Sequence, residues 1–208
     1  MPHMRIAEVE IPAPMLAALQ QAYAEPPRAY HHFGHVQEVL REHAWVAQGD
    51  GWSRPVETTL AVLYHDAIYV AGRPDNEARS AQLAREQLAR WMPEAGIDVE
   101  RVAQLIEFTA RHGQWTPEDF GDDADADDTR RFLDCDMAIL GAPPDEFDCY
   151  DRAIEEEYRG VVPRWLFRRK RRAFLRGLLA LERIYLSDEF HKRLDSPARQ
   201  NLAERLRA

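Results

Sequence analysis

The sequence predicts an all-α protein, because three features of its pattern agree. Apolar residues recur at the three- and four-residue spacing of amphipathic helices along most of the chain. The alternating pattern typical of strands is missing. Proline and glycine stand between the periodic stretches, where they end helices, as at Pro26-Pro27 and at Gly141-Ala142-Pro143.

The periodic stretches predict helices in order along the chain. The first runs from about Met15 to Tyr23 and the second from about Tyr30 to Gln48. Pro55 suits the first turn of a third helix, which continues to about Tyr69 and is apolar nearly all round, so we expect it at the centre of the core. The next predicted helices cover residues 76–91, 98–113 and 129–141. The second of these begins after the N-cap Asp98 and ends at the terminating glycine Gly113. An acidic irregular stretch is predicted from Gly113 to Asp128, and three more helices follow residue 141.

Composition narrows the class of protein. A chain of 208 residues with 45% hydrophobic and 30% charged residues is typical of one globular domain. Its formal net charge of −9 gives no reason to expect a nucleic-acid partner, and no apolar run reaches the ~20 residues that span a membrane. The N-terminus lacks the pattern of a signal peptide, and two cysteines cannot form a disulfide framework. These features predict a cytoplasmic protein.

Four polar residues interrupt the apolar faces of three predicted helices. His35 adjoins the apolar face of its helix, the pair His65-Asp66 interrupts the most hydrophobic helix, and Asp136 follows later in the chain. Residues three and four positions apart share a helix face, so the neighbours of Asp136 predict that it points into the core. Those neighbours are Phe132, Leu133, Ile139 and Leu140.

A metal ion would account for this arrangement. An unpaired carboxylate on an apolar face costs several kcal/mol, and a divalent cation held by two imidazoles and two carboxylates would offset that cost. Mixed nitrogen and oxygen ligands suit Mn²⁺, Fe²⁺, Co²⁺, Ni²⁺ or Zn²⁺ without choosing among them. Asp134, two residues before Asp136, has arginines among its neighbours and is expected to face outward, but it stays the alternative last ligand.

The order of these residues resembles the H…HD…D signature of the HD superfamily of metal-dependent phosphohydrolases. The likeness is to a bacterial branch of about this length and spans most of the chain. The stretches that carry it are Arg28–His35, Tyr64–Tyr69, Asp75–Ala81, Phe132–Gly141, Glu157-Tyr158 and Ala198–Leu202.

The resemblance implies a single helical bundle over residues 1–208, with a metal-ligand core at about 28–141 and C-terminal helices over 143–208 that pack on it. It implies one divalent ion (Mn, Fe, Co, Ni, Zn or Mg) held by His35, His65, Asp66 and Asp136. The implied reaction is hydrolysis of a phosphomonoester of a small metabolite, such as a nucleotide, in which the ion activates a bound water and polarises the phosphoryl group.

Further residues are candidates for catalysis and substrate binding. Several phosphohydrolases of the superfamily carry a glutamate within one turn after the His-Asp pair. Here Ala67, Ile68 and Tyr69 occupy those positions, so Glu77 is the nearest substitute as general acid or base. His112 could reach the same site, or it could stabilise a helix C-terminus. The candidates for phosphate contact are Arg28, His31 and His32. Arg28 could instead be a solvated arginine. The two histidines could instead be surface residues or ligands of a second metal ion.

Three other functions stay open. The chain could be a module that binds metal and nucleotide without turnover, since the nearby glutamate is missing. It could be a di-iron oxygenase of the same scaffold, which needs more histidine ligands. The cationic run of Arg164, Arg168, Arg169, Lys170, Arg171, Arg172 and Arg176 could bind nucleic acid, although a solvated face paired with Glu155, Glu156 and Glu157 is the favoured interpretation.

Overall fold

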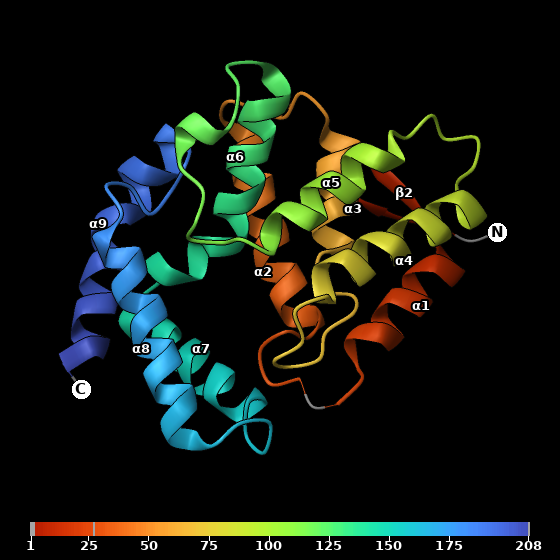
Figure 1. Ribbon diagram of the computed structural model, residues 1–208. Helices are drawn as coiled ribbons and strands as arrows, with labels where there is room; N and C mark the ends of the chain where they lie inside the picture. The colour runs from red at the N-terminus through yellow and green to blue at the C-terminus, as the bar shows by residue number, and fades with distance from the viewer. Residues whose placement is uncertain (1–2, 27, 208) are drawn as a thin grey trace. The chain divides into compact units, whose positions relative to one another are not determined.

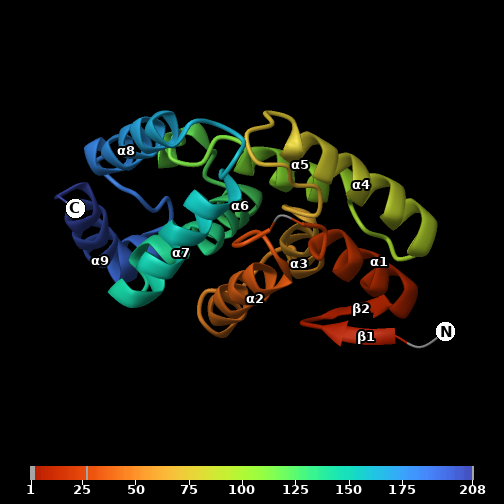
Figure 2. The same cartoon turned by 90° about the horizontal axis from the view of Figure 1, so that it is seen from below.

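The computed structural model describes residues 3–26 and 28–207 (Figures 1 and 2). The chain divides into two compact units, one ending at Ala110 and the other beginning at Arg111. Helices dominate both units, so the predicted all-α class is confirmed. The HD type and the single domain over residues 1–208 stay predictions. The division falls within the predicted metal-ligand core at 28–141, so the predicted ligands belong to both units.

The N-terminal unit is built around one apolar helix. This helix, α3 (Pro55–Tyr64), is buried from Thr58 to Tyr64, as predicted for the centre of the core. It contacts α2 (Phe33–Gln48), α4 (Asn76–Trp91) and α5 (Val99–Thr109). Helices α4 and α5 lie side by side in both views (Figures 1 and 2). The side chain of Asp98 accepts a hydrogen bond from the backbone N–H of Arg101 at 3.0 Å, which confirms the predicted N-cap of α5.

A short antiparallel hairpin precedes the first helix, and the sequence analysis missed it. Strand β1 (His3–Ile6) pairs with β2 (Val9–Pro12), which leads directly into α1 (Ala13–Tyr23). Ala7 in the turn has a φ of +50°, a left-handed conformation that usually selects glycine. Because alanine occupies that position, no glycine marks the turn in the sequence.

Two predicted helix ends are wrong. Helix α3 stops at Tyr64 rather than near Tyr69, with His65 as its C-cap. Helix α5 stops at Thr109, so Gly113, whose φ is +73°, does not directly follow the helix as predicted. The early end of α3 matters most, because it places Asp66 outside the regular helix.

The C-terminal unit contains the remaining helices. The stretch that was predicted to be irregular up to Asp128 becomes helical at Ala124, because Asp123 accepts a hydrogen bond from the Ala126 N–H at 2.8 Å and so caps the helix. Acidic side chains in the first turn also suit the positive end of a helix. The elements are η1 (Pro117–Asp119), α6 (Ala124–Met137), η2 (Ala138–Gly141), α7 (Pro144–Glu157), α8 (Arg164–Ala180) and α9 (Asp188–Arg207).

Two general expectations can be compared with the described residues. Across residues 3–26 and 28–207, no helix combines the length and apolar character needed to cross a membrane. Both cysteines are free thiols, with Cys135 buried and Cys149 exposed.

Candidate metal centre

Three of the four predicted metal ligands lie together in the N-terminal unit. His35 belongs to the first turns of α2, while His65 and Asp66 follow the end of α3. The Nε2 atoms of His35 and His65 are 3.1 Å apart, and Asp66 Oδ2 lies 3.1 Å from His65 Nε2 and 3.6 Å from His35 Nε2. Both histidines are almost fully buried, at 3% and 1% exposure, and Asp66 is partly exposed.

The spacing of these three atoms fits one divalent cation. A metal–ligand distance of about 2.1 Å places neighbouring ligand atoms about 3.0 Å apart in octahedral and about 3.4 Å apart in tetrahedral coordination. Two of the separations in the cluster, both 3.1 Å, lie within this range, and the third, 3.6 Å, lies slightly above it. Two neutral imidazoles and one carboxylate are also a donor set that first-row transition metals accept. The residues present therefore fit the ion that the sequence predicts.

The backbone of α3 sets the tautomer of His65. Its Nδ1 atom lies 2.8 Å from the carbonyl oxygen of Val62, one turn earlier in the chain. A carbonyl can only accept, so Nδ1 carries the proton and donates it. The Nε2 atom of neutral His65 then offers its lone pair towards His35 and Asp66, as a metal ligand must.

Arg28 contacts the backbone around the cluster. Its Nη1 donates to the carbonyl oxygens of His31 and Asp66, each at 2.7 Å, and its Nη2 donates to that of Ala67 at 2.9 Å. Its guanidinium carbon also lies 5.1 Å from the centre of the Tyr23 ring. These donors are engaged by backbone carbonyls, so the geometry gives Arg28 a structural role, and its phosphate contact stays a prediction.

The two histidines before His35 have different surroundings. His32 is the N-cap of α2, where its Nδ1 accepts a hydrogen bond from the Gly34 N–H at 2.9 Å, so the structure gives it a capping role. His31 stacks on Tyr69 with ring centres 3.9 Å apart, and its ring centre lies 6.1 Å from that of His35. Of the two, His31 is therefore the one that lies beside the cluster. Glu77 lies in the first turn of α4 and is partly buried.

In the C-terminal unit, His112 and Asp136 form a pair. His112 Nε2 lies 2.7 Å from Asp136 Oδ2, and both side chains are partly buried, at 19% and 13% exposure. The predicted position of Asp136 in the middle of a buried stripe is therefore only partly right. His112 and Asp136 were both predicted for the same site, but a direct contact between them was not predicted.

Asp134 is the deeply buried carboxylate of this helix, which corrects the expectation that it faces outward. Its Oδ1 accepts a hydrogen bond from the Leu186 N–H at 2.8 Å, and its Oδ2 accepts from the N–H and hydroxyl of Ser187 at 2.7 and 2.6 Å. Burial raises the pKa of Asp134 to about 7, and these donors act in the opposite direction. Both carboxylate oxygens already bind the segment before α9, and Asp136 as the last ligand stays a prediction.

Arginines of the cationic helix α8 pair with acidic residues of α7. Glu155 Oε1 lies 2.7 Å from Arg164 Nε and 3.5 Å from Arg168 Nε, and Asp151 Oδ1 lies 2.9 Å from Arg171 Nε. The expected partnership with Glu155 is confirmed. The Arg171–Asp151 pair is largely buried, whereas Arg164 and Arg168 are exposed, as expected of a solvated face; the interpretation of α8 as such a face instead of a nucleic-acid surface stays a prediction.

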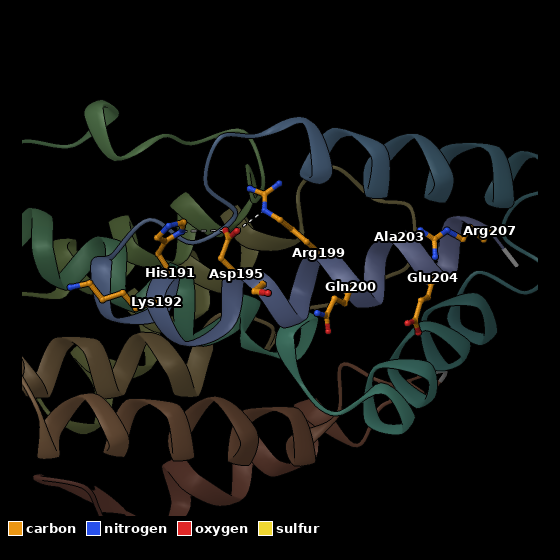
Figure 3. A pocket seen from close by; sticks show the side chains of 9 residues that line it. His191, Lys192, Asp195, Arg199, Gln200, Ala203, Glu204 and Arg207 are labelled. Atoms are coloured by element: carbon orange, nitrogen blue, oxygen red, sulfur yellow. Dashed lines mark hydrogen bonds and ion pairs between the residues drawn. The ribbon is translucent and has the colours of Figure 1, made fainter.

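A groove of about 590 Å³ runs along α9 (Figure 3). Three of its polar side chains pair with one another, because Asp195 lies 3.3 Å from His191 Nδ1 and 2.5 Å from Arg199 Nε. Arg199 also donates to the carbonyl oxygens of Leu179 and Leu181. Within this groove, Asp195 and Arg199 therefore hold α9 and the preceding segment together.

Three side chains that contact the segment after His65 were not predicted from the sequence, and Arg28 was predicted for a different role. Tyr23, Asn76 and Ser80, together with Arg28 in its structural role, bind the backbone of this segment. One signal was present: Asn76 and Ser80 precede Ala84 and Leu88 at intervals of four, which continues the buried stripe of α4 with polar residues.

Comparison with protein-family models, with curated proteins and with solved structures gives no match for this chain. The candidate site therefore rests on its own geometry and on the resemblance of its residue pattern.

Proposed function

We propose that the protein is a metal-dependent phosphohydrolase of the HD type that acts on a small phosphorylated metabolite, such as a nucleotide. The observation that carries the proposal is the cluster of His35, His65 and Asp66, whose ligand atoms lie within 3.6 Å of one another. The H…HD…D order adds Asp136 as the fourth ligand.

The protein groups of the cluster prepare it for an ion. The Val62 carbonyl holds His65 in the tautomer whose Nε2 is free of a proton, and both imidazoles are almost fully buried. Asp66 supplies negative charge beside them. A bound divalent ion would supply Lewis acidity and a water of lowered pKa.

Two further side chains have roles in the proposal. His31 lies beside the cluster, held by its stack on Tyr69, and an imidazole there can donate a hydrogen bond to a phosphoryl oxygen or a proton to the leaving oxygen. Glu77 is the candidate general acid or base from the sequence pattern. Glu77→Gln turning over substrate at the wild-type rate would remove it from the mechanism.

The first experiment compares the metal content of the purified wild type with that of the His65→Ala/Asp66→Ala double variant, by elemental analysis after dialysis against Mn²⁺, Ni²⁺ or Fe²⁺. We expect about one ion per chain in the wild type and its loss in the double variant. That ion is then used in a screen for phosphate release from phosphomonoesters, with nucleoside monophosphates included.

Other results would redirect the proposal. Wild-type protein that binds none of these metals would refute it. Two irons per chain would indicate oxygen chemistry. Saturable nucleotide binding with one metal bound, but no phosphate release, would identify a binding module without turnover.

A further inference from the structure

Beyond the ligands themselves, the backbone that carries Asp66 has an unusual set of partners. Between Asp66 and Val70 the chain has left α3 without entering another helix or strand. A partly buried backbone of this kind needs hydrogen-bond partners for its N–H and C=O groups, because leaving them unmade costs about 1–3 kcal/mol each. The Ala67 N–H donates to the Tyr64 carbonyl at 3.0 Å, and side chains from two other parts of the N-terminal unit bind much of the rest.

Tyr23 and Arg28 hold the first part of the segment. The Tyr23 hydroxyl accepts a hydrogen bond from the Asp66 N–H at 3.2 Å and donates to the Leu63 carbonyl at 3.1 Å. Arg28 donates to the Asp66 and Ala67 carbonyls at 2.7 and 2.9 Å. The peptide groups on both sides of the Asp66 Cα are thus fixed by side chains from the end of α1 and the segment after it.

Asn76 and Ser80 of α4 hold the second part. The Ser80 hydroxyl accepts from the Ile68 N–H at 3.0 Å and lies 3.2 Å from the Ile68 carbonyl oxygen, to which it donates. The Asn76 amide accepts from the Val70 N–H and donates to the Val70 carbonyl, both at 3.0 Å, as a neighbouring strand would. Both side chains are buried, at 5% for Asn76 and 0% for Ser80.

The same contacts fix the groups next to the cluster. Arg28 also donates to the His31 carbonyl at 2.7 Å, so one guanidinium joins the segment entering α2 to the segment after α3. Tyr69, between the anchored residues Ile68 and Val70, stacks on His31. The relative position of His31, Tyr69 and Asp66 therefore depends on side chains that contribute no ligand atom to the cluster.

We infer that Tyr23, Arg28, Asn76 and Ser80 form a positioning scaffold that sets the metal affinity of the site by holding Asp66 against His35 and His65. The inference rests on the proposed metal site, which it deepens. Residues that orient metal ligands from outside typically change affinity about 10- to 100-fold when they are replaced. In this inference, Asn76 and Ser80 of the Asp75–Ala81 stretch position the Asp66 backbone, and this role does not depend on Glu77.

A matched pair of variants tests the scaffold in the full-length protein. Tyr23→Phe removes the hydroxyl that contacts Asp66, whereas Tyr64→Phe removes a buried hydroxyl of the same unit that donates to Gln87 at 2.8 Å. Titration calorimetry with Mn²⁺ or Zn²⁺ should show at least a ten-fold weaker affinity for Tyr23→Phe and less than a two-fold change for Tyr64→Phe. Ser80→Ala should behave like Tyr23→Phe.

A second measurement reads the backbone directly, without metal. Hydrogen exchange followed by NMR should show faster exchange of the Asp66 amide in Tyr23→Phe and of the Ile68 amide in Ser80→Ala, with neither change in Tyr64→Phe. Arg28→Lys keeps the positive charge but loses the fork of N–H donors. It replaces Tyr23→Phe or Ser80→Ala in both measurements if one of these variants does not fold. Its control is Arg85→Lys, which loses a similar fork to Glu100 and Glu107.

The outcomes separate the two proposals. A wild type that binds no metal refutes the proposed function, and unchanged amide exchange in the variants then refutes the scaffold as well. A wild type that binds metal, with Tyr23→Phe and Ser80→Ala binding it as tightly as Tyr64→Phe does, refutes the scaffold alone. Weakened binding that merely tracks lost thermal stability, with Tyr64→Phe equally weakened, also refutes it.

Discussion

The Nδ1 atom of His65 lies 2.8 Å from the carbonyl oxygen of Val62, so the last turn of α3 determines which nitrogen of this imidazole carries the proton. We predict that the metal-free protein holds His65 as the Nδ1–H tautomer near neutral pH. Nitrogen-15 NMR of the imidazole should show an unprotonated Nε2 whose resonance shifts when Zn²⁺ is added. A protonated Nε2 in neutral His65 would contradict the assignment.

The ligand set predicts a stabilisation by metal that depends on His35. Ligand present at about 100 times its Kd adds about 2.7 kcal/mol to the free energy of unfolding. We expect Mn²⁺ or Zn²⁺ at that excess to raise the melting temperature of the wild type and not that of His35→Asn. The control is His32→Asn, because asparagine is itself a good N-cap. An equal loss of the metal effect in both variants would contradict the prediction.

Asp134 and Asp136 should differ in their effect on stability. Asparagine at 134 places an NH₂ group against backbone and hydroxyl donors, so Asp134→Asn should lower the free energy of unfolding by about 2–3 kcal/mol. Asp136→Asn loses one partly exposed pair with His112 and should cost about 1 kcal/mol or less. Urea denaturation at pH 8 measures both. Equal costs would show that the hydrogen bonds of Asp134 contribute little.

The same two variants test the last ligand. If Asp136 completes the site, as the H…HD…D pattern predicts, Asp136→Asn should lose most of its bound metal while its fold is retained. Asp134→Asn should keep metal under conditions in which it is folded. The reverse result, measured as metal content after dialysis, would return Asp134 to the ligand set.

Stability should depend on pH through His43, a buried histidine of α2. Its Nε2 lies 2.9 Å from Thr58 Oγ1 and its ring stacks on Trp52, and burial lowers its pKa from 6.5 to about 4. Between these values the unfolded chain binds the proton and the folded protein does not. His43 therefore makes the free energy of unfolding depend on pH by on the order of 3 kcal/mol at most. This stability is fully present above pH 6.5 and is lost as the pH falls through 4.

His43→Gln provides the comparison for this pH effect. Urea denaturation between pH 4 and 7 should give a shallower rise in unfolding free energy for His43→Gln than for the wild type. The readout is the slope of the unfolding free energy against pH, so a stability loss that is the same at every pH does not affect it. Identical slopes would show that other groups produce the effect.

The sequence predicted most helices, because their apolar spacing is local information. It also predicted that His35 and His65 turn inward, and both are buried. It failed where a distant part of the chain decides the outcome. Apolar residues continue past Tyr64, yet α3 ends there, and side chains from α1, α4 and the segment after α1 supply hydrogen-bond partners to the backbone beyond it.

The choice between Asp134 and Asp136 failed for a related reason. The neighbours of Asp136 on the helix are apolar, so helix periodicity placed it inward and Asp134 outward. The structure instead covers Asp134 with the backbone amides of Leu186 and Ser187, more than fifty residues later in the sequence. Periodicity within one helix contains no information about such donors.

The way the segment after His65 is held has a consequence for how the protein tolerates sequence change. A helical peptide group keeps its hydrogen bond whatever side chain a neighbouring residue bears, apart from proline. From Asp66 to Val70, by contrast, the Ala67 N–H has a backbone partner, but the N–H groups of Asp66, Ile68 and Val70 donate to particular side chains. One codon change at position 23, 28, 76 or 80 therefore removes an anchor. A saturation-mutagenesis map should therefore show these four positions to be as intolerant as the metal ligands.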